Sequence, residues 1–227
     1  MPKILIIAAT KMTKLNFERY SYLGLSLRRL GTDSAIESAI CYENQVALAH
    51  TYNQAIAEPY SDRIVVFTHD DVWIDDFWLT TRLEEALAAF DVVGLAGNVQ
   101  RLPGQPALAF PTVIGQWDSP ENLSGRVCHF NTRTGDQVSI FGSPGKRCKL
   151  VDGCFLAARV DRLLKAGIKF DPQFAFHFYD MDFCRSAEKG GLTMGTWPIA
   201  ITHASGGAFG SAEWKASHEL YERKWKD

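Results

Sequence analysis

The chain has 227 residues and a mass of 25.3 kDa, which fits one full-sized domain or a domain with a large insertion. Its formal net charge of -2 argues against nonspecific binding to nucleic acid. No transmembrane segment is predicted, so any membrane contact is expected to be peripheral. The five cysteines are odd in number and none has Cys-x-x-Cys spacing, which favours reduced thiols in a cytoplasmic protein.

The first hundred residues alternate between strand-like and helical patterns. Apolar runs predict strands at residues 3–8, 35–41, 64–67 and 92–96. Apolar residues at helical spacing predict helices at residues 17–30, 44–58 and 78–90. This alternation predicts βαβ units and a mostly parallel sheet flanked by helices.

The second half begins with a different kind of segment. Residues 101–145 hold five of the nine prolines and show no long periodicity, which predicts an insertion of loops and short antiparallel strands such as 138–141. Beyond it, strands are predicted at 150–157 and 195–202, and helices at 159–166, 181–189 and 212–226. A loop rich in Gly and Ser is predicted at 205–211. The whole chain is thus expected to form a single α/β domain.

Three groups of polar residues stand where such a fold would bind a ligand. His69, Asp70 and Asp71 follow a predicted strand directly, and His203 follows another. In open α/β sheets, ligands bind at the carboxyl ends of the strands. Aspartates in such places also cap helices, and a lone histidine is commonly structural, so each group alone leaves both interpretations open.

The third group is a pair of carboxylates at a predicted helix start. Asp180 and Asp182 lie in FAFHFYDMDFCRSAEKGG, a stretch crowded with aromatic residues. Capping is again one interpretation, because the helix dipole favours acids in the first turn. The other is catalytic, because an acid in apolar surroundings can have a raised pKa and act as a general base.

The order of four motifs carries a resemblance to a known family. They are the Asp-Asp pair after a strand, then VDGCFLAARVDRL, KFDPQFAFHFYDMDFCRSAEKGGLTMGTWP and ITHASGG. Together they resemble the family 2-type glycosyltransferases, and NQVALAHTYNQAIAE resembles an early helix of that family. The similarity covers most of the chain but is thin across residues 101–145. It implies a GT-A fold, in which residues 1–100 form a nucleotide-binding half and residues 101–227 an acceptor-binding and catalytic half.

The resemblance also implies a role for each polar group. Asp70, Asp71 and His203 match positions that bind Mn²⁺ or Mg²⁺, which in this family bridges the diphosphate of a nucleotide-sugar donor (UDP-, GDP- or dTDP-linked). Asp180 matches the catalytic base of inverting members, which deprotonates a hydroxyl of a carbohydrate or other acceptor. Asp182 is expected to support this base.

Other residues are expected around the donor and the acceptor by their place in such a fold. Asp152 and Gly153 should lie near the donor sugar or the acceptor, although Gly153 also suits a plain tight turn. Trp117 and His177 are expected on the acceptor side, where aromatic faces can stack on sugar rings. The residues expected to border the nucleotide are Ala8, Ala9, Thr10, Glu43, Asn44 and His69.

Two alternatives remain at this point. A nucleotidyltransferase or metal-dependent phosphohydrolase could also use acids and a histidine at strand ends, although the sequence shows one convincing histidine ligand where dinuclear hydrolases need more. A catalytically silent module that binds nucleotide sugars is the second alternative. It stays open because Thr68 replaces the first Asp of the family's metal motif and Tyr179 replaces a Glu before the base.

Overall fold

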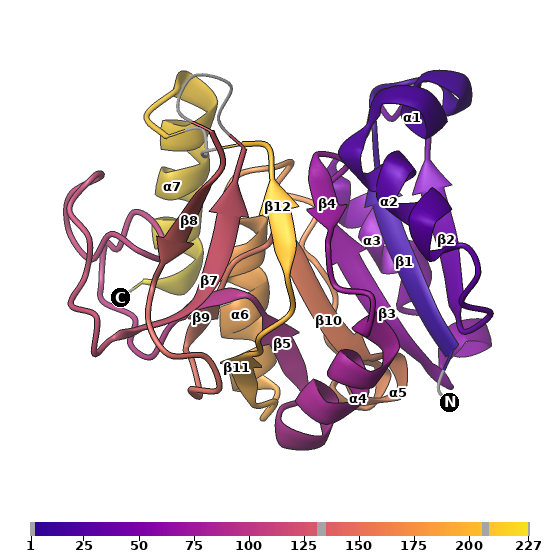
Figure 1. The fold of residues 1–227 in the computed structure, drawn as a ribbon. Coiled ribbons are helices and arrows are strands. Elements are labelled where there is room, and N and C mark those ends of the chain that lie inside the picture. Colours follow the sequence, from indigo (N-terminus) through magenta and orange to yellow (C-terminus); the bar gives the residue numbers. More distant parts are fainter. Residues whose placement is uncertain (1–2, 131–134, 206–208, 227) are drawn as a thin grey trace.

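The structure is a computed structural model, and it describes residues 3–130, 135–205 and 209–226. Its strands form two six-stranded sheets that lie side by side (Figure 1). The first has the order β11-β5-β10-β3-β1-β2 and consists of β1 (Lys3–Ala9), β2 (Ile36–Cys41), β3 (Arg63–Thr68), β5 (Val92–Gly94), β10 (Phe155–Arg159) and β11 (Met194–Thr196). β1 is parallel to β2 and β3, and β11 to β5, whereas β10 is antiparallel to both of its neighbours. This first sheet corresponds to the mostly parallel sheet that the sequence predicted.

The second sheet is mostly antiparallel. It has the order β4-β12-β7-β6-β9, with β8 paired to β7, and consists of β4 (Val72–Ile74), β6 (Ala96–Asn98), β7 (Leu123–His129), β8 (Gln137–Ile140), β9 (Leu150–Val151) and β12 (Ile201–His203). Among its pairs, β12 and β7 run parallel. This pairing carries the last strand of the chain into the middle of the molecule (Figure 1).

Helices pack against the first sheet. The described residues form α1 (Lys14–Tyr20), α2 (Tyr22–Leu30), α3 (Leu48–Ala55), α4 (Leu79–Ala89), α5 (Val160–Ala166), α6 (Tyr179–Lys189), α7 (Ala212–Trp225) and a 3-10 helix (Glu58–Tyr60). α3 packs against β1, α5 against β3 and β10, and α4 against β5 and β10. Within the described ranges, no helix is both long enough and apolar enough to cross a membrane.

The central strands are apolar along their whole length. In β1, every residue from Ile4 to Ala8 is at most 4 % exposed, and β3 is equally buried from Ile64 to Thr68. Because β1 and β3 are covered on both faces, their sequences are continuous apolar runs instead of alternating patterns. The polar residues that follow β3 are therefore attached directly to a rigid, buried strand.

Two predicted helices are shorter than their apolar pattern suggests. The helix predicted at 17–30 is divided into α1 and α2, because the hydroxyl of Ser21 accepts a hydrogen bond from the Gly24 N–H at 2.8 Å and caps the second helix. The helix predicted at 44–58 is reduced to α3, since the Asn44 side chain hydrogen-bonds the backbone two residues further on. Such side chain–backbone bonds compete with helix formation.

Three predicted strands are each divided between the two sheets. The apolar runs 92–96, 150–157 and 195–202 become the pairs β5 and β6, β9 and β10, and β11 and β12. Each run passes from one buried sheet into the other. Both of its strands are apolar, so the pattern hardly changes where the first strand ends and the second begins. The crossing after β9 contains Asp152 and Gly153, which brings these two residues to the line where the sheets meet.

The segment predicted as an irregular insertion also contains a central strand. β7 lies between β12 and β6, and its first three residues are buried. Gly125 in this strand has φ +98°, and a Cβ placed there would lie 1.8 Å from the Leu95 carbonyl oxygen. A glycine at this position allows β7 to approach the neighbouring chain closely enough to enter the sheet.

Helix α7 holds the beginning of α6 through a buried carboxylate. Asp182 has no exposed surface, and its Oδ1 accepts a hydrogen bond from Trp225 Nε1 at 2.8 Å and lies 2.7 Å from Lys224 Nζ. Burial raises the pKa of Asp182 despite the opposing effect of Lys224. Lys224 also lies 2.7 Å from Asp171, so one ammonium group ties three segments together.

Replacing Lys224 by Met is expected to destabilise the protein by about 2 kcal/mol, because the Asp182 carboxylate loses its cation while remaining buried. The free energy of unfolding from urea denaturation measures this. Lys215→Met, on an exposed position of the same helix, is the matched control and should change stability by less than about 0.5 kcal/mol. Equal effects of the two substitutions would contradict this account of the α6–α7 contact.

Candidate active site

Three side chains meet beyond the end of β3. The antiparallel pairing of β12 with β4 places His203 opposite Val72, next to the turn that holds His69 and Asp71. His203 Nε2 lies 3.3 Å from Asp71 Oδ1, and His69 Nδ1 lies 3.9 Å from the same oxygen. One potential ligand atom from each of the three residues lies within 4.8 Å of the others. This group, His69, Asp71 and His203, is called the His–Asp cluster below.

The His–Asp cluster fits a divalent cation. Asp71 Oδ1 and His203 Nε2 are both buried and have no hydrogen-bond partner among the described residues. Burial raises the pKa of Asp71, but His203 and His69 outweigh it and the pKa is lowered. Burial lowers the pKa of His203, but Asp71 outweighs it and the pKa is raised. A carboxylate oxygen and two imidazoles are ligands that Mn²⁺ accepts, and the two atoms without hydrogen bonds suit a bound ion.

The structure differs here from the set of ligands expected from the sequence. Asp71 and His203 come together, but Asp70 is not part of the His–Asp cluster, and His69 takes its place. Asp70 instead uses its backbone carbonyl to accept a hydrogen bond from the N–H of Leu23 in α2, at 3.2 Å. The turn after β3 directs every second residue to the same side, which the adjacent carboxylates in the sequence do not reveal.

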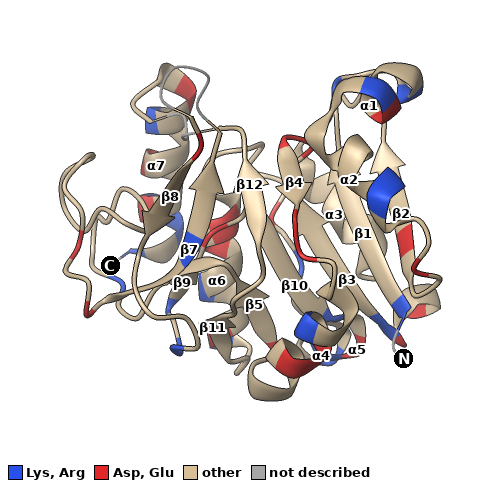
Figure 2. Cartoon of the chain, viewed as in Figure 1, with Lys and Arg blue, Asp and Glu red and all other residues tan. Residues whose placement is uncertain are grey.

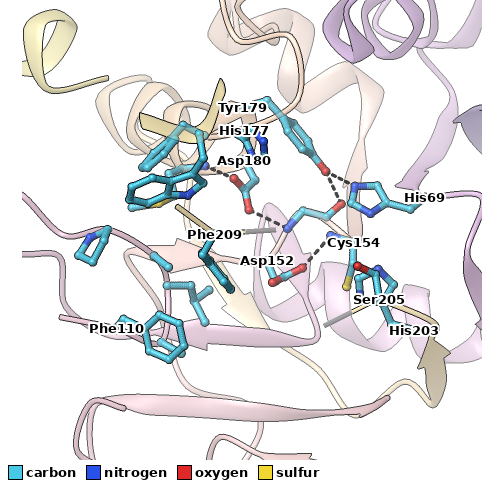
Figure 3. A pocket seen from close by; sticks show the side chains of 18 of the residues that line it. His69, Phe110, Asp152, Cys154, His177, Tyr179, Asp180, His203, Ser205 and Phe209 are labelled. Atoms are coloured by element: carbon cyan, nitrogen blue, oxygen red, sulfur yellow. Dashed lines mark hydrogen bonds between the residues drawn. The ribbon is translucent and has the colours of Figure 1, made fainter. Parts of the chain in front are cut away.

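Tyr179 fixes which nitrogen of His69 is available. The Tyr179 hydroxyl donates a hydrogen bond to the Gly153 carbonyl at 2.8 Å and lies 2.7 Å from His69 Nε2 (Figure 3). Because a phenol has one proton and the carbonyl can only accept, His69 Nε2–H must donate to the Tyr179 oxygen. Burial lowers the pKa of His69, which favours its neutral form. A neutral imidazole with its proton on Nε2 leaves the Nδ1 lone pair facing Asp71.

Asp180 stands in the first turn of α6, apart from the His–Asp cluster. Its Oδ2 accepts a hydrogen bond from the Gly153 N–H at 3.1 Å, and its Oδ1 accepts one from the Met181 N–H at 2.9 Å. Burial and the nearby Asp152 carboxylate raise the pKa of Asp180 to about 7. A half-buried carboxyl group with such a pKa can exchange a proton near neutral pH, as a general base must.

Gly153 lies at the centre of this arrangement. Its carbonyl accepts a hydrogen bond from Tyr179, which supports the His–Asp cluster, and its N–H donates one to Asp180. One residue thus contacts both parts of the site. A Cβ on Gly153 would lie 2.3 Å from the Tyr179 hydroxyl and 2.8 Å from Asp180 Cβ. The absence of a side chain is therefore a packing requirement. The neighbouring Asp152 accepts a hydrogen bond from the Cys154 N–H at 2.8 Å (Figure 3).

The His–Asp cluster and Asp180 line one pocket of about 410 Å³. Figure 3 shows His69 and His203 on one side of it and Asp180 with His177 on another. Its lining includes these residues from the sequence-based predictions: His69, Asp71, Trp117, Asp152, Gly153, His177, Asp180 and His203. Such a volume lies within the usual range for small-molecule sites.

Other predicted residues lie outside this pocket. Asp182 points away from it, into the contact between α6 and α7. The predicted nucleotide-binding residues after β1 and β2 meet through backbone hydrogen bonds, from Thr10 N to Cys41 O at 2.9 Å and from Asn44 N to Thr10 O at 2.9 Å. With Ala8, Ala9 and Glu43 they form the neighbouring ends of two parallel strands, beside the pocket lining and not within it.

The pocket lining also includes residues beyond the predicted ones. Tyr179 supports His69, Phe110 and Phe209 form part of the wall, and His129 lies opposite His203 in the pairing of β7 with β12. The position of Tyr179 directly before Asp180 was a signal, since it replaces a Glu there. The predicted loop at 205–211 lies partly outside the described residues, because 206–208 are not described.

Basic side chains are distributed over many elements. Figure 2 shows Lys and Arg on α1, α2, α4 and α7. Among the described residues that line the pocket there is no Lys or Arg, whereas Asp71, Asp152 and Asp180 are all present. An anionic ligand in this pocket would therefore depend on a bound cation to offset its charge.

The fold is similar to the folds of solved glycosyltransferases. The catalytic domain of Drosophila beta1,4-galactosyltransferase 7 aligns over 96 % of this chain and 80 % of its own, with a TM-score of 0.52 and 10 % identity. GalNAc-T7, solved with UDP, GalNAc and Mn²⁺, aligns over 100 % of this chain and 48 % of its own, with a TM-score of 0.55 and 9 % identity. The sequence matches no protein-family model and no curated protein. The chain thus has the mixed α/β fold of GT-A glycosyltransferases, as the sequence predicted.

Proposed function

We propose that this protein is a metal-dependent, inverting glycosyltransferase of the family 2 type. One observation carries the proposal: a single pocket holds a group of metal-ligating side chains and, separately, a half-buried carboxyl group whose pKa is raised to about 7. Transfer from a nucleotide sugar needs both parts, a cation at the diphosphate and a base at the acceptor hydroxyl. The fold, which is that of enzymes with such donors, supports the same conclusion.

The His–Asp cluster would hold the metal through His69, Asp71 and His203, with His69 in place of Asp70. Two imidazoles favour Mn²⁺ over Mg²⁺, which prefers oxygen ligands. When bound, the cation would neutralise the charge that develops on the diphosphate leaving group. The Mn²⁺ and UDP in the GalNAc-T7 complex support this assignment, and a UDP-, GDP- or dTDP-linked sugar is the proposed donor.

Asp180 would act on the acceptor. Its ionised carboxylate takes the proton of an acceptor hydroxyl while the oxygen attacks the anomeric carbon of the donor sugar. The new carbon–oxygen bond forms on the face opposite the breaking bond to the diphosphate, and the nucleoside diphosphate leaves with the electron pair. The backbone N–H groups of Gly153 and Met181 fix the carboxylate for this step.

The two alternatives fit the site less well. In the described part of the chain there is one cluster of metal-ligating residues, whereas the dinuclear hydrolases need ligands for two ions. A silent binding module would not need the raised pKa of Asp180. Tyr179, whose replacement of a Glu kept that alternative open, contacts His69 as a structural support.

Five free cysteines support the cytoplasm as the proposed location, because reduced thiols persist there.

Donor hydrolysis without an acceptor tests the proposed function. UDP-, GDP- and dTDP-sugars are incubated with the intact chain and Mn²⁺, and release of the nucleoside diphosphate is measured with and without EDTA. Metal-dependent release from at least one donor is expected. If no donor is hydrolysed or bound in a metal-dependent manner, the transferase proposal is wrong.

Tyr179→Phe is expected to weaken Mn²⁺ binding by about tenfold to a hundredfold, because His69 loses the partner that holds its ring and its tautomer. Calorimetric titration with Mn²⁺ measures the effect. Tyr42→Phe is the matched control, since Tyr42 packs on Phe17 with ring centroids 5.5 Å apart and does not line the pocket. Unchanged Mn²⁺ affinity in Tyr179→Phe would remove His69 from the proposed ligand set.

A further inference from the structure

The pocket has a second end made of aromatic side chains. Phe110 lies near Trp117 and Phe209, with ring centroids 6.2 and 5.4 Å away, and Trp117 packs on Phe141 at 5.0 Å. These four residues are called the aromatic end below. Figure 3 shows Phe110 at the end of the pocket opposite His69 and Tyr179. Trp117 is 50 % exposed and Phe209 43 % exposed, so their faces are open to a ligand.

The backbone of the adjoining wall has few polar groups to offer. The Leu108 carbonyl already accepts hydrogen bonds from Asn98 at 3.0 Å and Gln105 at 3.2 Å, and the Ala109 carbonyl accepts one from Asp118 N at 2.8 Å. Asp118 itself is occupied by side-chain amides, including that of Asn98 at 2.8 Å. This wall therefore faces the pocket with apolar surface.

The aromatic rings could stack on one face of a sugar, but the adjoining wall offers its hydroxyl groups few hydrogen-bond partners. Sugar hydroxyl groups need hydrogen-bond partners, and each one buried without a partner costs about 1–3 kcal/mol. The carboxylates and most imidazoles of the described lining lie at the other end, in the His–Asp cluster and around Asp152 and Asp180, whereas Ser139 is the polar side chain near Phe141. In the proposed function, the donor sugar and its diphosphate occupy that end of the pocket.

The charges of the pocket lining restrict the class of acceptor further. The described lining contains three carboxylates and no Lys or Arg. A metal bound at the His–Asp cluster would be engaged by the donor's diphosphate, so an acceptor with a carboxylate or phosphate would face Asp152 and Asp180 with no cation of its own. Like charges at short range in a partly buried site are strongly unfavourable.

Building on the proposed function, we propose that the acceptor is a neutral alcohol or phenol whose hydroxyl is attached to an apolar, ring-bearing body. The body packs against Phe110, Trp117 and Phe209, and the hydroxyl extends toward Asp180. In the transfer step the hydroxyl proton goes to the Asp180 carboxylate and the oxygen bonds to the anomeric carbon, as described above. The aromatic end thus selects the acceptor by its apolar surface and by its lack of charge.

A set of three small probes tests this inference by binding alone. Naphthylethanol carries a ring and a neutral hydroxyl, naphthylacetate carries the same ring and a negative charge, and glycerol is a neutral alcohol without a ring. Dissociation constants for the intact chain are measured by NMR titration in the presence of Mn²⁺. Naphthylethanol should bind roughly tenfold more tightly than either of the others.

Two variants locate the binding. Trp117→Ala and Phe209→Ala should each raise the dissociation constant of naphthylethanol about tenfold, since each removes an aromatic contact. Trp78→Ala is the matched control, because Trp78 is 72 % exposed, does not line the pocket, and should leave binding unchanged. Equal binding of the three probes, or binding that neither pocket variant weakens, would overturn the inference.

Donor hydrolysis measured on the same preparations separates the two proposals. If hydrolysis is absent while naphthylethanol binds as described, the transferase proposal fails and the aromatic end stands as a site for neutral apolar alcohols. If hydrolysis occurs but glycerol or naphthylacetate binds as well as naphthylethanol, the transferase proposal stands and the acceptor class is wrong.

Discussion

Replacing Asp180 by Asn is expected to reduce sugar transfer by about a hundredfold to ten-thousandfold while nucleoside diphosphate and Mn²⁺ still bind. The amide retains the shape of the side chain but cannot take a proton from the acceptor, and a positioned general base contributes a factor of this size. The measurement is kcat for transfer, together with calorimetric titration of the metal and nucleotide. Loss of nucleotide binding in a folded Asp180→Asn protein would instead give Asp180 a role in binding.

Asp182→Asn is the matched control for this experiment. Both aspartates lie in the first turn of α6, but Asp182 is buried and contacts Lys224 and Trp225, whereas the half-buried Asp180 lines the pocket. Its substitution should lower stability and change kcat little. A larger fall of kcat in Asp182→Asn than in Asp180→Asn would reverse the roles of the two residues.

The pH dependence follows from the same carboxyl group. Since burial and Asp152 raise the pKa of Asp180 to about 7, the group is mostly protonated at pH 6 and mostly ionised at pH 8. Only the ionised form is a base, so kcat of the wild-type protein should rise with pH through about 7. The residual activity of Asp180→Asn should show no such rise.

The second large effect is expected at the metal ligands. Asp71→Asn should weaken Mn²⁺ binding by more than the roughly hundredfold effect of losing an outer-shell partner, because it removes a ligand carboxylate itself. Nucleoside diphosphate should then bind no better with Mn²⁺ than without it. Titration of the variant with Mn²⁺, followed by titration with nucleotide, measures both effects.

Asp70→Asn distinguishes the ligand set given by the structure from the one given by the sequence. Asp70 is adjacent to Asp71 but outside the His–Asp cluster, so this variant should keep its affinity for Mn²⁺ within a factor of about two. An equal loss of Mn²⁺ binding in Asp70→Asn and Asp71→Asn would show that the sequence-based assignment is the better one. His203→Ala should resemble Asp71→Asn in either case.

The fold could be predicted from the sequence because its central elements have strong local patterns. β1 and β3 are continuous apolar runs, which are typical of strands covered on both faces. The second sheet was the harder part. Its strands are short, and β6 and β12 continue apolar runs that begin in the first sheet, so hydrophobicity alone does not mark where one sheet ends. β7 was hidden in a segment whose prolines suggested loops.

The site could be predicted in part for a similar reason. Asp71, Asp180 and His203 follow strands or begin a helix, and their positions relative to those elements are readable in the sequence. Which residue of a turn faces the pocket depends on backbone angles that the sequence does not show, and this is why His69 and not Asp70 joins Asp71 and His203. The aromatic end is built from residues far apart in the chain, Phe110 and Phe209 among them, and only tertiary packing brings them together.

The contact between α6 and α7 has a consequence for the order in which the site is completed during synthesis. The turn that carries Asp180 is held by Trp225 and Lys224, which leave the ribosome more than forty residues later. The strands of the first sheet all precede α7 in the chain, so they are synthesised before these two residues. In a nascent chain that lacks α7, the first turn of α6 should therefore still be without the contacts that Trp225 and Lys224 make with Asp182.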